Sequence, residues 1–240
     1  MDVGFWKEGS TFAVRFTPNK VGKWTYTVTC SDTANEDIHG KTGVVLCKEN
    51  DGSSETEKHG FIKIDESNRF FTYDDGTPFF WLGDTNWQAP NYIQTNACNY
   101  PGCRCNNQFK HEVDNRKAKG FNVYQTYFDS ATSDGGGQRG VLPSIWKKTF
   151  SEPNVEVFNE KIDYMFKYLH DQGMVVALGL GVHTSTMNNM PEKDFLRFVR
   201  YVIARYSCYS LVWIAGQEIT DDRIAGKTPE KTTLEVYMEG

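Results

Sequence analysis

The sequence predicts a mixed α/β fold, in which an antiparallel β segment precedes a larger domain built on a parallel sheet. Three observations predict it. Residues 5–47 alternate apolar and polar positions and are rich in β-branched and aromatic residues, as antiparallel strands are. After residue 58, strand-like and helix-like segments alternate, which is typical of βα units. The apolar run LVWIA at 211–215 resembles a strand that is buried on both faces.

The first segment, 1–57, reads as a partial antiparallel β-sandwich followed by a linker. It contains FAVRFTPNKVGKWTYTVTC and GKTGVVLC, with Pro18, Gly22 and Gly43 at expected turns. Three or four strands fit there, whereas a complete sandwich of this kind has about seven. The polar run KENDGSSETEK at 48–58 predicts the linker.

The second segment, 58–240, carries four expected strands at 79–83, 121–126, 174–180 and 211–215. Two shorter strands precede them and meet at a turn at Asp75-Gly76. A helix that ends at Gly173 is expected to bury Phe158, Ile162, Met165, Phe166 and Leu169. A helix that opens at Pro191 is expected to bury Phe195, Phe198, Val199, Val202, Ile203 and Tyr206. A more polar helix is expected at 108–119.

Polar residues follow each expected strand end, which favours a barrel over an open doubly wound sheet. In a barrel these ends converge on one face, where such enzymes carry their chemistry. No glycine-rich phosphate loop follows the first strand, so nucleotide binding has little support. The residues concerned are Asp84, Asn86, Gln125, Tyr127, Asp129, His183, Gln217 and Glu218.

Composition narrows the class of protein. The 240 residues, 39% of them hydrophobic, are enough for a sizeable core. The net charge of −5, with no long basic run, gives no reason to expect nucleic acid or anionic membrane as a partner. No apolar stretch reaches the roughly 18–20 residues of a membrane span, and the first residues lack a signal-peptide layout. The protein is therefore either intracellular or lacks its true start.

Three of the six cysteines, Cys98, Cys103 and Cys105, are clustered. Their spacing matches no common zinc pattern, so we expect no metal site. A loop held by a disulfide bond is the better interpretation, and a disulfide bond favours a secreted or extracytoplasmic location. Cys208, between aromatic residues, reads as a small buried side chain.

Each strand-end residue has a structural alternative to a binding role. Asp84 is also a residue type that caps helices and turns. Trp87 is either a core residue or a platform for the apolar face of a sugar ring. Gln125 and Tyr127 at a barrel mouth need a ligand or water as partner. His183 is either a hydrogen-bonding group in a pocket or a solvated loop residue.

Glu218 is the strongest catalytic candidate, because it follows the apolar strand 211–215 directly. Burial at an apolar barrel mouth raises the pKa of a carboxylic acid and keeps it protonated near neutral pH, as a general acid requires. The alternative is a solvated residue at the start of the next loop.

Three blocks, DDGTPFFWLGDTNW, KGFNVYQTYF and RYSCYSLVWIAGQE, resemble the corresponding blocks of the apiosidase-like glycoside hydrolases, and the segment 12–43 resembles the β-sandwich that precedes their barrel. The resemblance implies a (β/α)8 TIM barrel, of which this chain would hold the first half. It implies Glu218 as acid/base, Gln217 as a hydrogen-bond partner of the sugar 2-hydroxyl, and Asp84 and Trp87 as pocket residues. Family members often carry Asp at the acid position.

The expected activity is therefore hydrolysis of a glycosidic bond in an oligo- or polysaccharide, without metal or organic cofactor. The second carboxylate is expected after strand 7, beyond this sequence, so the chain reads as a fragment; Asp221, Asp222 and Glu230 are too close to Glu218 to serve. The segment 129–157, with Trp146, is expected to form a rim over the site. Two alternatives stay open: a carbohydrate-binding protein that has lost catalysis, and a β-sandwich adaptor supported by its barrel.

Overall fold

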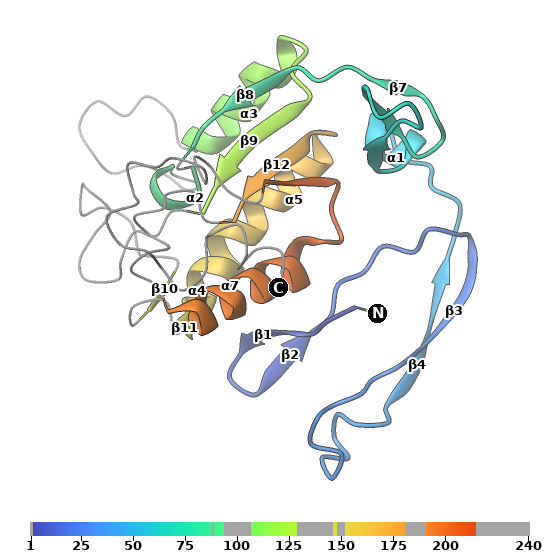
Figure 1. Cartoon of the computed structure of the whole chain (residues 1–240), viewed down its shortest axis with the longest axis vertical. Coiled ribbons are helices and arrows are strands. Elements are labelled where there is room, and N and C mark those ends of the chain that lie inside the picture. The colour runs from blue at the N-terminus through green and yellow to red at the C-terminus, as the bar shows by residue number, and fades with distance from the viewer. Residues whose placement is uncertain are drawn as a thin grey trace.

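A four-stranded parallel sheet is the centre of the fold (Figure 1). The computed structural model describes residues 2–87, 89–93, 107–128, 146–147, 152–180 and 191–214. The strands are β8 (Gly83–Thr85), β9 (Val123–Tyr127), β12 (Val175–Gly179) and β13 (Leu211–Ile214), and they lie side by side in chain order. This confirms the parallel α/β class.

Three of the four expected strands lie within two residues of their expected bounds. The expected strand at 79–83 is wrong. The chain there ends one antiparallel strand, β7 (Pro78–Phe79), and starts β8 four residues later. Phe80 and Leu82, both exposed, lie in the connection between the two sheets, so an apolar run that looked continuous serves two different strands.

Helices cover one face of the parallel sheet. They are α3 (Gln108–Ala118), α5 (Asp163–Asp171) and α7 (Glu192–Tyr206), with α4 (Val155–Val157) and a π-helical turn η1 (Phe158–Ile162) leading into α5. The short helix α2 (Ala89–Tyr92) follows β8, and a two-residue pairing joins β10 (Trp146–Lys147) to β11 (Glu152–Pro153). The main core lies between these helices and the sheet residues Tyr124, Val176 and Leu178.

The expected helix faces are largely confirmed. Phe158, Ile162, Met165, Phe166 and Leu169 are all buried. On α7, Val199 is only partly buried and Ile203 is 38% exposed, while Arg205 two residues after Ile203 is fully buried.

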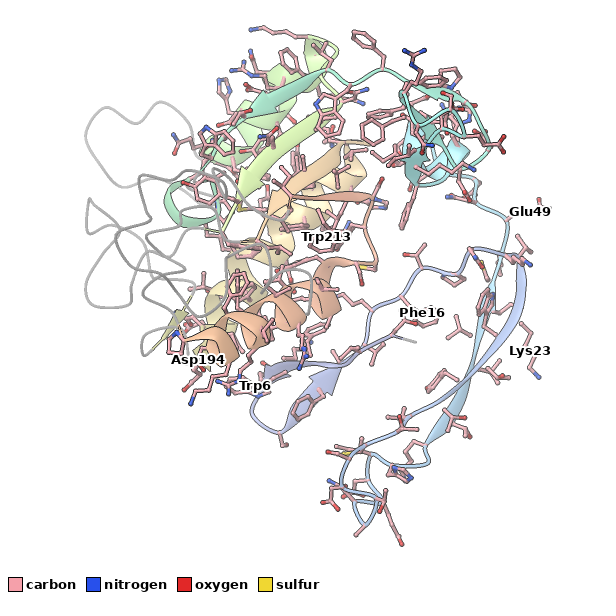
Figure 2. All side chains as sticks on the ribbon, in the orientation of Figure 1. Trp6, Phe16, Lys23, Glu49, Asp194 and Trp213 are labelled. Carbon is pink, nitrogen blue, oxygen red and sulfur yellow. The ribbon has the colours of Figure 1, made fainter. Side chains whose placement is uncertain are left out.

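The opposite face of the sheet packs against a small antiparallel sheet of β5 (Ile62–Ile64), β6 (Phe71–Tyr73) and β7. Tyr73 and Phe79 form a second core with Val123, Val175 and Ala177. The expected turn at Asp75-Gly76 joins β6 to β7, and Gly76 takes a left-handed φ of 92° there. Trp213 on β13, at one end of the described strand order, is 37% exposed (Figure 2).

The amino-terminal strands form two separate ribbons in the described part of the chain. β1 (Phe5–Glu8) pairs with β2 (Thr11–Ala13), and β3 (Gly22–Thr27) pairs with β4 (Thr42–Cys47). Gly43 lies opposite Tyr26, whose ring occupies the space of a Cβ at that position. The antiparallel strands were expected, but a sandwich is not seen in these two ribbons.

The expected linker at 48–58 ends in a helix, α1 (Glu55–His59). Ser54 accepts a hydrogen bond from the Glu57 amide, and the Glu57 carboxylate accepts one from the Ser54 amide. This capping box is a sequence signal for a helix start, although the polar composition of residues 48–58 predicted a linker.

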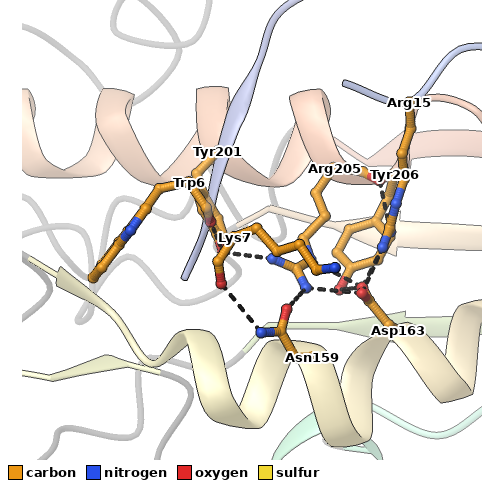
Figure 3. Close-up of polar contacts among 8 residues, drawn as sticks. All are labelled: Trp6, Lys7, Arg15, Asn159, Asp163, Tyr201, Arg205 and Tyr206. Carbon is orange, nitrogen blue, oxygen red and sulfur yellow. Dashed lines mark hydrogen bonds and ion pairs between the residues drawn. The ribbon is translucent and has the colours of Figure 1, made fainter. Parts of the chain in front are cut away.

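A buried polar network joins the amino-terminal ribbon to the helices (Figure 3). Arg15 and Arg205 both donate to the carboxylate of Asp163, and Tyr206 donates to the same carboxylate. Backbone carbonyls of β1 complete the contact: Trp6 accepts from the Tyr201 hydroxyl, and Lys7 accepts from the Asn159 amide.

Three further features of the described residues concern a membrane span, the cysteines and a metal site. Among the described residues, no helix combines the length and the apolar character that crossing a membrane requires. Cys30, Cys47 and Cys208 are free thiols. Cys98, Cys103 and Cys105 lie outside the described residues. The described part of the chain holds no group of three or more His, Cys, Asp or Glu side chains arranged to bind a metal ion.

Candidate active site

The candidate site lies at the carboxyl ends of the parallel strands, on the face away from the helices. Thr85, Gln125, Ala177 and Val212 align across the four strands, and one step further Tyr127, Gly179 and Ile214 align. Gln125 is half-buried beside these small and apolar neighbours. The alternation of each strand thus places the Gln125 amide on the same sheet face as Thr85, Ala177 and Val212.

Trp87 and Tyr127 come together at this end of the sheet. Their ring centroids are 5.6 Å apart with an interplanar angle of 54°. The Tyr127 amide donates to the Trp87 carbonyl at 3.0 Å, which holds Trp87, two residues after β8, to the end of β9. Tyr127 is 5% exposed, whereas Trp87 is 41% exposed and offers its ring to solvent. An indole held on one side and open on the other suits the apolar face of a sugar ring.

Asp84 lies on the opposite face of the sheet. It aligns with Tyr124, whose ring packs against Phe109 of α3. The Asp84 carboxylate forms an ion pair with Arg116 of the same helix. This hydrogen bond is the main reason that the pKa of Arg116 is raised. The structure therefore does not bring Asp84 to the face that Gln125 and Tyr127 share.

Asn86 also contacts α3. Its side-chain nitrogen donates to both carboxylate oxygens of Glu112, at 3.1 and 3.0 Å, and the Tyr124 hydroxyl donates to Glu112 at 2.9 Å. Burial, reinforced by the nearby Glu112 carboxylate, raises the pKa of Tyr124, so its hydroxyl stays protonated and available as a donor.

Glu112 and Arg116 were not expected from the sequence to contact the strand-end residues. One signal was available in the sequence. Glu112 and Arg116 are one helical turn apart on a polar helix, and Asp84 and Asn86 are two residues apart on an extended segment.

His183, Gln217 and Glu218 lie outside the described residues, as does most of the expected rim at 129–157. Their strands are described: β12 ends at Gly179 and β13 at Ile214. Gly179 and Ile214 align with Tyr127 in the sheet register, so both strands end level with the aromatic pair.

Comparison with known families shows the family of this chain. The apiosidase-like catalytic domain matches residues 65–238, which is more than two thirds of the 240 residues. The chain belongs to the apiosidase-like family. A domain of unknown function, DUF5060, matches residues 2–31. No curated protein sequence is significantly similar to this apiosidase-like chain.

Solved structures share its fold. A Bacteroides vulgatus ATCC 8482 protein assigned to the glycoside hydrolases has a TM-score of 0.70 at 18% identity, over 98% of this chain and 44% of that one. A family 5 glycoside hydrolase from the same organism has a TM-score of 0.54 at 18% identity, over 78% and 37%. A third structure, described as a glycoside hydrolase, has a TM-score of 0.54 at 16% identity, over 78% and 38%.

The apiosidase-like chain thus spans less than half the length of the solved structures that it matches. The resemblance inferred from the sequence is confirmed as a family, and the mixed α/β class with a parallel sheet is confirmed as a fold. Each of these three solved structures is itself described as a glycoside hydrolase.

Proposed function

We propose that the protein hydrolyses a glycosidic bond in an oligo- or polysaccharide, at a site on the carboxyl-end face of its parallel sheet. The observation that carries this proposal is the Trp87–Tyr127 pair beside Gln125 on that face, in a chain of the apiosidase-like family. An exposed indole, a tyrosine and an amide together offer stacking and hydrogen bonding to a sugar.

The sheet is proposed to be the first half of a (β/α)8 TIM barrel. Four parallel strands in chain order, with helices on one face, support this topology, because a doubly wound sheet reverses its strand order. The aromatic residues Tyr73 of β6 and Phe79 of β7 pack with Val123, Val175 and Ala177 on the inner face, and the proposal places substrate at the carboxyl ends of the strands. In the same proposal the amino-terminal ribbons belong to a β-sandwich, and a polymeric substrate favours an extracytoplasmic location.

Glu218 is proposed as the general acid/base. It follows the end of β13 by four residues, and β13 is the fourth parallel strand in chain order. A protonated carboxyl there would donate to the leaving glycosidic oxygen. The partner carboxylate is assigned to the end of strand 7 of the complete barrel. A separation of about 5–5.5 Å between the two gives a covalent intermediate and retention, and about 6.5–9.5 Å gives inversion through water.

The binding roles are proposed from the structure for Trp87, Tyr127, Gln125 and Asp84, from the family resemblance for Gln217, and from its position after a strand for His183. Trp87 is proposed to form the sugar platform, with the buried Tyr127 ring packed against it, and Gln125 is proposed as a hydrogen-bonding group beside it. Gln217 and His183 are proposed to contact sugar hydroxyls. Asp84 is proposed to act on the site indirectly, because its carboxylate is paired with Arg116. No metal or organic cofactor is part of this mechanism.

The test is incubation of the full-length protein with a panel of plant and bacterial oligosaccharides, with chromatographic detection of products. The proposal expects release of a defined sugar from at least one substrate class. Binding of an oligosaccharide without cleavage would instead support a catalytically inactive carbohydrate-binding protein. Neither binding nor cleavage across the panel would overturn the proposal.

A further inference from the structure

The segment from Gly83 to Trp87, GDTNW, divides its side chains between the two faces of the sheet. Asp84 and Asn86 contact α3, whereas Thr85 aligns with Gln125 and Trp87 packs on Tyr127. Asp84 and Asn86 therefore hold the motif to a helix, and Thr85 and Trp87 face the proposed site.

The spacing of the contacts matches on both elements. Asp84 and Asn86 are two residues apart on an extended segment, which separates them by roughly 6–7 Å. Arg116 and Glu112 are four residues apart on a helix, which separates them by about 6 Å along its axis. One turn of α3 thus contacts both Asp84 and Asn86. We call the two contacts, Asp84 with Arg116 and Asn86 with Glu112, the β8–α3 bridge.

The bridge is complementary in charge and hydrogen bonding. Arg116 is a cation opposite the Asp84 carboxylate, and Glu112 is an acceptor opposite the Asn86 amide. The Tyr124 hydroxyl also donates to Glu112, so this carboxylate is held from the strand β9 as well as from the segment after β8. Charge-assisted hydrogen bonds of this kind are stronger and more directional than neutral ones.

Main-chain hydrogen bonds connect the β8–α3 bridge to the position of Trp87. The Asn86 amide donates to the Gln125 carbonyl at 2.9 Å, and the Trp87 carbonyl accepts from the Tyr127 amide at 3.0 Å. With the Asn86 side chain fixed by Glu112 and its main chain fixed by β9, the position of the next residue, Trp87, is fixed too.

We propose that Glu112 and Arg116 are positioning residues, which set Trp87 for sugar binding through the β8–α3 bridge without touching the substrate. This inference rests on the proposed function, because it takes Trp87 as the sugar platform. It assigns the acidic residue of the GDTNW motif, Asp84, to the same bridge.

The test swaps the amide and carboxylate side chains of Asn86 and Glu112 in the full-length protein. Asn86→Asp sets two carboxylates against each other. The double variant Asn86→Asp/Glu112→Gln restores a donor and acceptor pair with the roles reversed. Lys117→Ala, an exposed lysine on the same helix, is the matched control. We expect Asn86→Asp to raise KM about tenfold with a smaller change in kcat, and the double variant to recover most of that loss.

A second measurement is independent of activity. Hydrogen exchange of the Asn86 and Tyr127 amides reports the two main-chain bonds directly. We expect exchange at both amides to be about tenfold faster in Asn86→Asp and close to wild type in the double variant. If Asn86→Asp does not fold, Glu112→Gln alone takes its place, with a smaller shift in the same direction.

The two readouts separate the two proposals. A wild-type protein that cleaves no substrate ends the proposed function, while the exchange rates still decide the bridge. Unchanged exchange and unchanged KM in Asn86→Asp would overturn the positioning role, as would a double variant no better than the single one.

Discussion

Asp163 and Arg205 are joined by two parallel hydrogen bonds, from Nε to Oδ1 at 2.9 Å and from Nη2 to Oδ2 at 2.8 Å. The Arg205 side chain is fully buried, and its guanidinium lies over the Phe5 ring with 4.8 Å to the centroid. Arg15 brings a second guanidinium to the same carboxylate. Asp163 therefore pairs with two cations at the contact between β1, β2 and the helices (Figure 3).

Asp163→Asn is expected to lower the free energy of unfolding by about 3 kcal/mol, because it leaves a buried arginine without its counter-ion. Denaturant unfolding measures this. Asp171→Asn, which removes an exposed pair with Lys167, is the control and should cost less than about 0.5 kcal/mol. Equal effects of the two substitutions would contradict a structural role for the network.

The same carboxylate makes stability depend on pH. Burial opposes ionisation of Asp163, but hydrogen bonds from Arg205 and Arg15 outweigh it, and the pKa lies below the ordinary value of 3.8. A lowered folded-state pKa contributes stability that is present above the unfolded-state value and is lost as pH falls through the folded-state value. The difference between wild type and Asp163→Asn should therefore shrink below about pH 4.

Lys161 in the π-helical turn has a buried Nζ with no hydrogen-bond partner among the described residues. Burial lowers its pKa to about 7. The cost of the buried charge is present below pH 7 and is relieved as pH rises toward the ordinary value of 10.5, because the folded protein binds fewer protons in that range.

Lys161→Met should therefore raise the free energy of unfolding by about 2 kcal/mol at pH 6, with a smaller gain at pH 9. Urea unfolding at the two pH values measures it. Lys167→Met, at an exposed position of α5, is the control. A loss of stability in Lys161→Met would show that the ammonium makes a favourable contact.

Gly83 opens the GDTNW motif where there is no room for a side chain. A Cβ there would lie 2.9 Å from Trp81 Nε1 and 3.4 Å from Val123 Cβ. Gly83→Ala should destabilise the protein by about 1–3 kcal/mol through overpacking. Gly4→Ala is the control, since its Cβ would meet neighbours at 3.6 and 3.7 Å, which is ordinary contact. Thermal unfolding of both variants distinguishes crowding at Gly83 from a general effect of alanine.

Trp87→Ala should weaken oligosaccharide binding roughly tenfold or more while the fold is retained, because the ring is partly exposed and its loss removes a stacking surface. Isothermal titration with the substrate found in the product screen measures it. Phe80→Ala is the control, since Phe80 is 78% exposed and precedes β8, at the other end of the sheet. An unchanged affinity in Trp87→Ala would remove Trp87 from the site.

The helices α5 and α7 were predictable because apolar residues repeat along them at the helical period. The strands β9, β12 and β13 were predictable as short, largely apolar runs, and β12 is buried at every position. The buried pair of Arg205 and Asp163 was not predictable in this way. Asp163 and Arg205 are 42 residues apart in the sequence, and Arg15 from the amino-terminal segment also binds Asp163. A local sequence pattern cannot predict contacts between residues so far apart.

The candidate site was predictable as a set of strand ends, but not in its division between faces. Sequence position placed Asp84 and Trp87 together, and the resemblance assigned both to the pocket. The register of β8 with β9 separates them, because Asp84 aligns with the helix-facing Tyr124. A three-residue strand is too short for its own pattern to show which side is covered.

The acid/base role of Glu218 is tested by the kinetics of Glu218→Gln in the full-length protein, on two glycosides of the same sugar. One carries a poor leaving group that needs protonation, and the other carries an activated phenol that does not. We predict a loss in kcat/KM of roughly 10²–10⁴ on the first, and a much smaller loss on the second. Unchanged turnover of the poor leaving group would contradict Glu218 as the acid and, with it, the proposed mechanism.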